Sequence, residues 1–375
     1  MPFGSEGRTE GIALALSGGG YRAVLFHCGA LRRLNELGVL SKLERISCVS
    51  GGSIIAGLLA VKWPRLTADG NGAFINLTSE VVDPLRAFCS RTLDVGAVLW
   101  GAVNPFKSAV DELVDAYRDR LGLDVSLRSL GVAGPRFVFN ATNYATGVSF
   151  RFSAPYCGDY RIGLIKDHSF DVATAVATSS AFPPVFAPVI VDVDPASFEP
   201  TPGADMYENV DFRRRLALAD GGVYDNLGLE TVWGRYTTVL VSDGGKPFEL
   251  DAKPSGSFAQ LARVADIGLN QALALRKRLL IDAFQKKQCH GTYWGIGTEI
   301  ADYGLGGGAL GVSVAKTEEL SAIRTRLNSF SDKEQEELMN WGYAVCDAAM
   351  RTHLPELCGN GSTLPLWPFP GRFMQ

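Results

Sequence analysis

The sequence predicts an α/β fold with a mostly parallel central sheet and helices on both of its faces. Short, continuous apolar runs recur along the chain, and such runs are typical of buried parallel strands. They alternate with segments whose apolar residues recur at helical spacing, and glycine-rich turns join the first strands to the helices that follow. This alternation of strand, turn and helix is the βαβ pattern, which builds parallel sheets.

The first elements follow the pattern most clearly. Residues 11–16 form an apolar strand, which the Ser-Gly-Gly-Gly sequence of residues 17–20 interrupts. Residues 21–37 then carry apolar side chains at helical spacing. Residues 45–49 predict a second strand, and residues 51–60 predict a second helix that is rich in small side chains.

Later elements are less sharply bounded. Further strands are predicted at 136–140, 148–152, 187–191, 216–219 and 237–241, and helices across 80–130 and at 258–288 and 331–353. Residues 192–211, rich in Pro, Asp and Glu, predict an exposed insertion, and the glycine-rich residues 304–311 predict a mobile loop. No repeat or domain boundary is evident. We therefore expect one domain over residues 1–375, with a motif-bearing core at about 11–245 and a mostly helical elaboration at 246–375.

Composition excludes several classes of protein. Of the 375 residues, 46% are apolar and 20% are charged, which excludes a disordered chain, a collagen-like repeat and a coiled coil. The net charge of −4 predicts no nucleic-acid partner. The sequence contains no run of about 18 apolar residues, the length that a membrane-spanning helix needs, and no apparent secretory signal. We therefore expect a cytoplasmic protein. The seven scattered cysteines, without a CxxC pair, predict reduced thiols and no metal site or other cofactor.

The first glycine-rich turn runs from Ser17 to Ala23. Its three glycines let backbone N–H groups converge on an anion at a helix N-terminus. Gly18-x-Gly20-x-x-Ala23 also satisfies a dinucleotide-binding fingerprint, which requires an acidic residue at the end of the next strand. Here the acidic residue, Glu44, stands at the wrong end of that strand, so the dinucleotide hypothesis fails.

The second turn, Cys48-Val49-Ser50-Gly51-Gly52-Ser53, nearly matches the nucleophile elbow G-x-S-x-G. Ser50 would expose its hydroxyl above the sheet, and the N–H of Gly51 would face the carbonyl oxygen of a bound ester. Ser53 is a rival nucleophile that lies about one turn into the helix. The plain alternative is that Ser50 only caps the helix that follows.

A serine nucleophile needs a base, and the sequence offers carboxylates and histidines. The order Ser50, Asp220, then His290 or His353 suits a hydrolase triad, but neither histidine follows a convincing strand. Asp220 ends an apolar strand in an Asp-Gly-Gly turn and could accept the serine proton directly. Burial would have to raise its pKa from the free value of about 3.9. Asp243, at a second Asp-Gly-Gly turn, is the rival base.

Taken together, these segments resemble the patatin-like phospholipases. That family has a glycine-rich oxyanion loop, a serine about 30 residues later, and an aspartate in an Asp-Gly-Gly or Asp-Gly-Ala turn. Residues 177–188 are similar to a fourth block of that family, S-S-A-x-P-x-x-F-x-P. The resemblance covers about residues 11–245. Two positions depart from it: Cys48 replaces the first glycine of the elbow, and Ala23 stands where many members have glycine.

The resemblance implies a role for each site residue. Ser50 would be the nucleophile and Asp220 the base of a Ser–Asp dyad. The expected oxyanion donors are the N–H groups of Gly18, Gly19 and Gly20, together with that of Gly51. The expected supporting residues are Arg22, which would steady the glycine loop or meet the phosphate, and Gly52, Gly221 and Gly222.

The implied activity is that of a lipid acyl hydrolase of the phospholipase A type, which works through an acyl-enzyme. Calcium is not implied, because no carboxylate cluster has the spacing of a calcium loop. An acyltransferase using the same acyl-enzyme, and a non-catalytic lipid-binding scaffold, remain as alternatives. The expected partner is membrane phospholipid at a peripheral contact. We further hypothesise that an activator or homo-oligomerisation switches the enzyme on.

Several segments are candidates for the lipid contact. Trp100, Phe106 and the apolar residues 364–369 could enter an interface, and the basic runs 213–215 and 276–278 could touch anionic head groups. The alternative for the apolar segments is packing in the core, and the alternative for the basic runs is a solvated surface.

Overall fold

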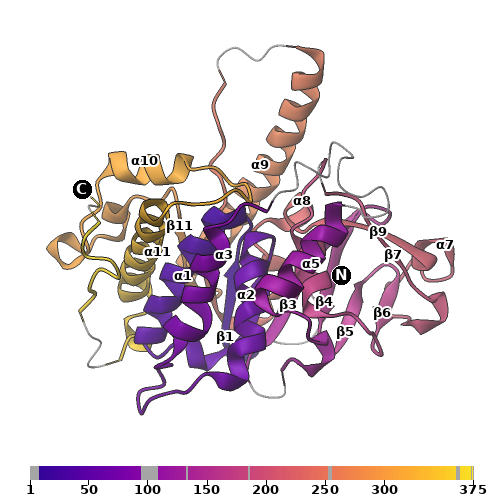
Figure 1. The fold of residues 1–375 in the computed structure, drawn as a ribbon, viewed down its shortest axis with the longest axis horizontal. Coiled ribbons are helices and arrows are strands. Elements are labelled where there is room, and N and C mark those ends of the chain that lie inside the picture. Colours follow the sequence, from indigo (N-terminus) through magenta and orange to yellow (C-terminus); the bar gives the residue numbers. More distant parts are fainter. Residues whose placement is uncertain are drawn as a thin grey trace.

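A mixed β-sheet runs through the molecule, and helices cover both of its faces (Figure 1). The computed structural model describes residues 8–93, 109–131, 134–184, 186–251, 256–359, 364–372 and 374. Within these residues the sheet has 11 strands. The predicted α/β class is confirmed.

The strands pair in the order β11-β10-β1-β2-β3-β4-β5-β6-β8, and β9 joins β3 to β7. Strands β11, β10, β1, β2 and β3 are mutually parallel, and the other pairs are antiparallel. The strands are β1 (Thr9–Leu16), β2 (Leu43–Cys48), β3 (Arg136–Asn143), β4 (Val148–Ser153), β5 (Tyr156–Asp159), β6 (Gly163–Ile165), β7 (Val189–Asp192), β8 (Phe198–Glu199), β9 (Arg215–Asp220), β10 (Tyr236–Asp243) and β11 (His290–Gly295).

The helices pack on both faces because successive side chains of the buried strands point to opposite sides. In β1, Leu14 and Leu16 join the core beneath α1, whereas Ala13 and Ala15 join the core beneath α9. The helices are α1 (Gly20–Glu36), α2 (Gly51–Lys62), α3 (Asp83–Cys89), α5 (Ala109–Leu121), α6 (Val172–Ser179), α7 (Asp211–Arg214), α8 (Gly222–Asp225), α9 (Ser257–Gln285), α10 (Val314–Ala322) and α11 (Asp332–His353).

Helix α11, from the C-terminal part of the chain, packs directly on α1. A Cβ atom on Gly29 would lie 1.9 Å from the carbonyl oxygen of Met339, and one on Gly342 would lie 1.9 Å from that of Phe26. Two glycines therefore let the helix backbones touch. This contact holds the C-terminal third of the chain against the helix that follows the glycine loop.

The predicted strands and long helices are present, with ends shifted by a few residues. Strands β5, β6, β8 and β11 were not predicted. Residues 192–211 are more than an exposed insertion, because β8 pairs with β6 at the edge of the sheet. Residues 304–311 include a short 3-10 helix at Gly306–Gly308.

The segments considered for lipid contact differ in their surroundings. Trp100 and Phe106 lie outside the described residues. Leu364 and Leu366 are 80% and 77% exposed, whereas Trp367 and Phe369 pack against the core. All seven cysteines are buried and free. Among the described residues, no helix is both long enough and apolar enough to cross a membrane.

Candidate active site

Ser50 occupies the sharp turn between β2 and α2, in a backbone conformation that is rare for a side chain other than glycine. Its φ and ψ angles are 51° and −119°. Hydrogen bonds hold the turn: the Ser50 N–H donates to the carbonyl oxygen of Ser179 at 3.1 Å, and the Gly52 N–H donates to that of Ser17 at 3.2 Å. The Ser50 side chain makes no capping hydrogen bond to α2. A capping role is therefore excluded for Ser50 in this structure, and the geometry is that of a nucleophile elbow.

The neighbouring side chains explain why the turn keeps this shape. The Ser53 hydroxyl lies buried 2.8 Å from the Ser179 hydroxyl, so this rival serine is bound away from solvent. The Ser179 hydroxyl also bonds the carbonyl oxygen of Asn140 at 2.6 Å, which ties α6 to β3 beneath the turn. Cys48, at the position of the usual glycine, is buried with its thiol 3.3 Å from the carbonyl oxygen of Val138.

The glycine loop lies directly against the serine turn, and only glycines allow this approach. A Cβ atom on Gly18 would lie 3.0 Å from the Cβ of Ser50, and one on Gly51 would lie 2.3 Å from the carbonyl oxygen of Gly20. Gly20 has a φ of +57°, and its Cβ would collide with the carbonyl oxygen of Thr325 at 1.8 Å. The backbone of the loop therefore lies against the turn that carries Ser50.

The backbone N–H groups that were predicted as oxyanion donors are not equally available. The Gly18 N–H donates to the carbonyl oxygen of Asn226 at 3.1 Å, so it is not free to bind a ligand. Between the described residues, no hydrogen bond uses the N–H of Gly19, Gly20 or Gly51. The proposed oxyanion donors are therefore the N–H groups of Gly19, Gly20 and Gly51. The N–H of Gly18, which was also predicted, is already engaged in its own hydrogen bond.

Asp220 ends β9 with its carboxylate buried beside Ser50. Its Oδ1 accepts a hydrogen bond from the Gly222 N–H at 2.6 Å, while its Oδ2 is buried and accepts none from the described residues. Burial raises the pKa of Asp220 to about 7, and the Gly222 N–H and the Ser50 side chain moderate this shift because they stabilise the charged form. A carboxylate with one open oxygen and a pKa near neutrality is suited to accept a proton.

Asp243, the rival base, has no such freedom. Its Oδ2 lies 2.6 Å from the Lys277 ammonium and accepts the Tyr293 hydroxyl at 2.7 Å, and its Oδ1 accepts the Gly245 N–H at 2.9 Å. Burial works against its charge, but Lys277, Tyr293 and Gly245 together lower the pKa of Asp243 below its ordinary value. In addition, Asp243 does not line the pocket described below.

The histidines stand apart from Ser50, and none of the four lines the pocket. His290 begins β11 and is exposed, at the edge of the parallel strands away from their carboxyl ends. The side chain of His353 contacts Tyr303. His27 is buried between Ser242 and the carbonyl oxygen of Ser17, and burial lowers its pKa to about 4. A Ser-His-Asp triad on Ser50 is therefore not formed.

A pocket of about 910 Å³ opens above the two turns and contains Ser50 and Asp220. Its walls are mostly apolar and come from segments far apart in the sequence. Phe182, Pro183 and Phe186 follow α6, and Leu269 and Leu273 belong to α9. Residues 325–328 complete the rim and are bound to the opposite side by the Leu93 N–H, which donates to the Leu327 carbonyl oxygen at 3.0 Å. The C-terminal third, which no motif placed, therefore builds much of the pocket.

The surroundings of Arg22 decide between its two predicted roles, which are to steady the glycine loop or to contact a phosphate. Its guanidinium is fully buried and donates to the carbonyl oxygens of Ser321 and Ile323 at 2.5 and 2.7 Å and to that of Gly244 at 3.0 Å. It therefore steadies the start of α1 against the C-terminal segment and cannot meet a phosphate. A side chain so enclosed by backbone carbonyls is a structural clamp.

The remaining predicted residues shape the two turns. Gly52 lies under the glycine loop, where a Cβ would come 2.4 Å from the carbonyl oxygen of Leu16. Gly221 lies against β3, where a Cβ would come 2.3 Å from the carbonyl oxygen of Asn140. Asn226, which was not predicted as a site residue, places its amide among Gly18, Gly222 and Gly245. Its place six residues after Asp220, in the polar turn that ends β9, was the only signal in the sequence.

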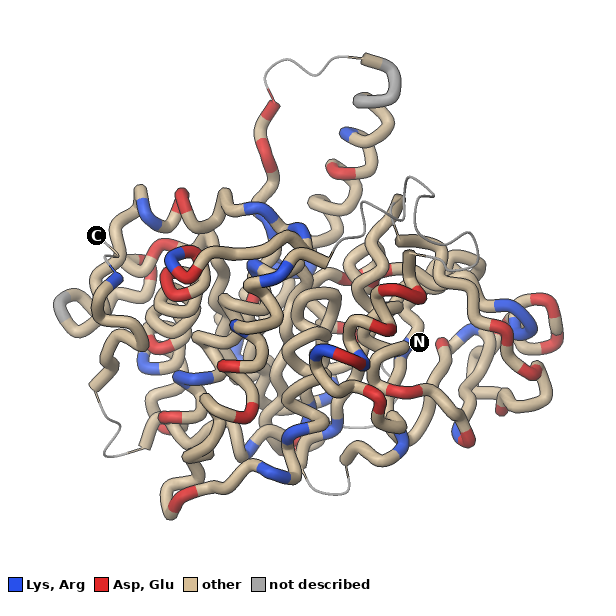
Figure 2. The backbone as a smooth tube through the Cα atoms, viewed as in Figure 1, with Lys and Arg blue, Asp and Glu red and all other residues tan. Residues whose placement is uncertain are grey.

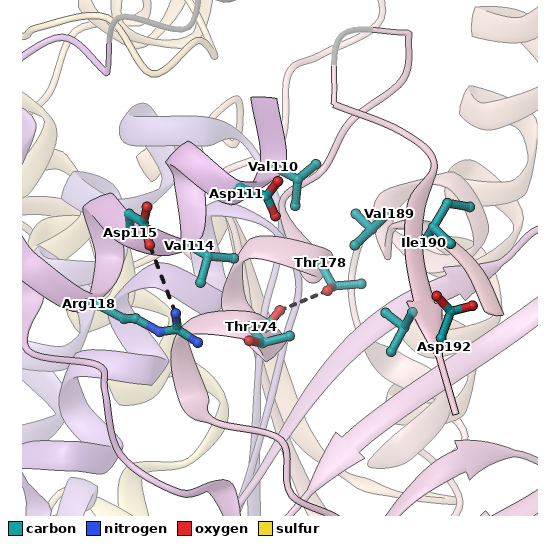
Figure 3. Close-up of a pocket in the computed structure, with 11 residues that line it drawn as sticks. Val110, Asp111, Val114, Asp115, Arg118, Thr174, Thr178, Val189, Ile190 and Asp192 are labelled. Carbon is teal, nitrogen blue, oxygen red and sulfur yellow. Dashed lines mark hydrogen bonds and ion pairs between the residues drawn. The ribbon is translucent and has the colours of Figure 1, made fainter. Parts of the chain in front are cut away.

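A second pocket of about 330 Å³ lies between α5, α6 and β7 and contains none of the predicted site residues. Figure 3 shows Arg118 turned toward Asp115, and Thr178 bonded to the backbone of Thr174. The Arg118 guanidinium also pairs with Asp171 at 2.6 Å. Within the described part of the chain, no three His, Cys, Asp or Glu side chains gather as a metal site would require.

Known proteins resemble this chain in family and in fold. A family model described as patatin-like phospholipase matches residues 14–233, more than half of the chain. No curated protein matches in sequence. Human GIVD cytosolic phospholipase A2 is similar in structure, with a TM-score of 0.50 and 11% identity over 93% of this chain and 62% of that one. The same human protein in complex with methyl γ-linolenyl fluorophosphonate gives 0.50 and 14% over 93% and 59%. The chain therefore spans about three fifths of the length of these structures.

Proposed function

Because the chain belongs to the patatin-like phospholipase family, we propose that it hydrolyses fatty-acyl esters of membrane phospholipids through a Ser50–Asp220 dyad. One observation carries the proposal: a strained, uncapped Ser50 and a buried Asp220 with one open oxygen share the floor of an apolar pocket. The pocket volume of about 910 Å³ suits an acyl chain. The cleavage is proposed to be of the phospholipase A type.

The reaction would proceed in two acyl transfers. The Ser50 oxygen attacks the ester carbonyl carbon while Asp220 accepts the hydroxyl proton, and the carbonyl oxygen becomes an oxyanion. The N–H groups of Gly19, Gly20 and Gly51 would stabilise that charge, and one such donor contributes about 3 kcal/mol in other enzymes. Collapse of the intermediate expels the lysophospholipid alkoxide, which takes the proton from Asp220, and leaves an acyl-enzyme.

The second transfer would regenerate the free enzyme. Water attacks the acyl-enzyme while Asp220 accepts one of its protons, and the resulting intermediate expels the Ser50 oxygen, which recovers that proton. The fatty acid then leaves. A pKa near 7 allows Asp220 to accept and return a proton within the same cycle.

We also propose that the whole chain acts as one unit. Arg22 and Gly20, in the motif-bearing part, contact residues 321–325 directly, and the pocket is incomplete without α9 and residues 325–328. A protein shortened to residues 11–245 would lose those walls and expose the apolar surface beneath them.

The test is fatty-acid release from phospholipid vesicles by the wild type, Ser50→Ala and Asp220→Asn. Release by the wild type alone is expected. The long-chain fluorophosphonate bound by the human relative is a suitable probe, because it should label the wild type and leave Ser50→Ala unlabelled. Transfer of the acyl group to another alcohol in place of water would show an acyltransferase. An unlabelled wild type would contradict catalysis and favour the lipid-binding scaffold.

A further inference from the structure

Helix α9 has two parts with different surroundings. Its C-terminal half packs on the sheet, where Leu280 is fully buried and Leu273 and Phe284 are partly covered. Its N-terminal part extends away from the body of the molecule (Figure 1). We call residues 260–268 of this helix, together with Leu250 on the adjacent strand-like segment, the α9 projection.

The α9 projection exposes large apolar side chains. Leu250 is 91% exposed, and Leu261, Val264 and Ile267 are 70%, 67% and 49% exposed. The three helical residues recur every third position, so they lie on neighbouring sides of one helix face. Most of the projecting helix is free of charge, as the tan tube in Figure 2 shows. Apolar side chains gathered in this way are expected to be covered by another apolar phase in the functional state.

The charged residues of the helical part are Arg263 and Asp266, and the exposed carboxylates Glu249 and Asp251 flank Leu250. The guanidinium of Arg263 stacks over the Phe248 ring at 4.3 Å and donates to the Glu249 carbonyl oxygen at 2.8 Å. Arg263 and Asp266 both line the pocket that contains Ser50. Arg263 and Asp266 therefore border the pocket, whereas Leu261 and Val264 are exposed to solvent.

The projection is continuous with the mouth of the pocket. Leu269 and Leu273 follow it on the same helix and line the pocket wall. Leu261 and Leu273 are separated by about 18 Å along the helix, at about 1.5 Å per residue. A surface that covered the projection would therefore adjoin the pocket wall formed by Leu269 and Leu273.

Charge at the base of α9 favours one kind of surface. Lys and Arg residues gather there (Figure 2), although the chain as a whole carries a net charge of −4. In the basic run 276–278, Arg276 and Lys277 are paired with Asp225 and Asp243. Arg278 is exposed, and so is Arg326 on the pocket rim; neither pairs with a carboxylate of the described residues. Arg278 lies 11 residues beyond Ile267 on α9, and Arg326 lies on the pocket rim. Exposed arginines are complementary to anionic lipid head groups.

We propose that the α9 projection docks the protein on a phospholipid surface that contains anionic head groups, with Leu250, Leu261, Val264 and Ile267 in the interface and Arg278 and Arg326 on the head groups. The inference rests on the proposed function for the source of the substrate, which enters the pocket along α9. It assigns lipid contact to a segment other than Trp100, Phe106 or residues 364–369.

Binding can be tested without catalysis, by sedimentation with vesicles of non-hydrolysable diether phosphatidylcholine, with and without one third diether phosphatidylglycerol. The wild type should bind the anionic vesicles more tightly. Val264→Asp with Ile267→Asp should weaken binding by about a hundredfold, because burial of each side chain is worth a tenfold or larger change in affinity. Arg278→Gln with Arg326→Gln should remove the preference for anionic vesicles and leave binding to phosphatidylcholine unchanged.

Ile75→Asp is the matched control, since Ile75 is 72% exposed and does not line the pocket. It should bind as the wild type does, and thermal unfolding should show that every variant is folded. Unchanged binding of the Val264 and Ile267 double variant would overturn the inference. A concentration-dependent dimer in sedimentation velocity, abolished by the same double variant, would also overturn it, because the projection would then cover a second copy. Failure of the proposed function would appear differently, as vesicle binding without fatty-acid release from ester lipids.

Discussion

Two Asp-Gly-Gly turns end β9 and β10, and the same three residues give their aspartates opposite properties. Asp220 and Asp243 are both buried, and in each the N–H two residues later bonds Oδ1, at 2.6 and 2.9 Å. The Oδ2 of Asp243 contacts Lys277 and Tyr293, whereas the Oδ2 of Asp220 has no partner among the described residues. Burial therefore raises the pKa of Asp220 to about 7, while the partners of Asp243 lower its pKa.

This difference shows that an Asp-Gly-Gly turn does not by itself leave its aspartate able to accept a proton. The partners of Asp243 lie far along the chain, on α9 and β11, so the Asp-Gly-Gly sequence itself does not show which aspartate is paired. A carboxylate held by a cation and a hydroxyl stabilises the fold. A carboxylate left with an open oxygen is costly to ionise and is available for proton transfer.

The largest expected effect separates the two aspartates by activity. Asp220→Asn should lower kcat/KM for phospholipid hydrolysis by about a hundredfold to ten-thousandfold, because general-base catalysis contributes about 10² to 10⁴. Asp243→Asn should lower it by less than about tenfold, because Asp243 lies outside the pocket. Initial rates of fatty-acid release, at protein concentrations corrected for folded fraction, measure both.

Fluorophosphonate labelling of Ser50 supplies the control for that experiment. Asp220→Asn should be labelled slowly but to completion with time, since its pocket and elbow remain. If Asp243→Asn were the inactive variant and Asp220→Asn the active one, the assignment of the base would be reversed.

The pH dependence of activity should follow Asp220. Only the carboxylate form accepts a proton, so kcat/KM should rise about tenfold per pH unit up to an apparent pKa of about 7 and then level off. His27 cannot produce this limb, because burial lowers its pKa to about 4. A kcat/KM profile that is flat between about pH 5 and 8 would contradict the raised pKa of Asp220, provided that the chemical step is shown to be rate-limiting. The limits of this range lie about two pH units below and one above that pKa.

Stability should respond to the two substitutions in opposite directions. The pKa of Asp220 is higher in the folded state, so the folded protein loses stability as the pH rises from about 4 through about 7. Asp220→Asn removes that loss and should increase the free energy of unfolding at alkaline pH by up to about 4 kcal/mol, with little change in acid. Denaturant unfolding at two pH values checks the sign. Equal effects at both pH values would show that ionisation of Asp220 is not the cause.

Asp243→Asn should instead destabilise the protein, by about 2 kcal/mol near neutral pH, because Lys277 loses its buried partner. Lys277 is 34% exposed, so water compensates for part of the loss. The effect should fade in acid, as the wild-type carboxylate is protonated there. Lys277→Met in the same background provides the control. If the second substitution restored no stability, the uncompensated ammonium would not be the cause.

How far the sequence predicted the fold depended on whether an apolar run marks the strand. Buried parallel strands such as β1 and β10 are continuous apolar runs, and they were predicted. Strands β5 and β6 are short and antiparallel, with glycine in each, and β11 contains His290, Gly291 and Thr292, so no apolar run marks them. Their positions come from pairing with neighbours that a local pattern does not contain.

The same limit applies to the pocket. Ser50, Asp220 and the glycine loop were predicted because each turn needs glycines that are visible in a few residues of sequence, although their catalytic roles remain a proposal. The clamp formed by Arg22 depends on carbonyl groups 299 and 301 residues away. The wall at residues 325–328 likewise carries no motif. Contacts of this range can be found only when the fold is known.

The smallest expected effect concerns the energetic coupling between the two Asp-Gly-Gly turns. A Cβ atom on Gly245 would lie 2.9 Å from Asn226 Nδ2, and one on Gly222 would lie 2.7 Å from Asn226 Oδ1, so one amide fills the space between the turns. Gly245→Ala should therefore destabilise the protein by about 1 to 2 kcal/mol, and Asn226→Ala should recover about 1 kcal/mol of that loss in the double variant. Unfolding by denaturant gives the four free energies of this cycle. If the free-energy changes of the two substitutions were strictly additive, Asn226 would not be what the new Cβ meets. The Cβ would then clash with the Asp243 side chain, which is also 2.9 Å away, and each turn would be held in place by its own carboxylate.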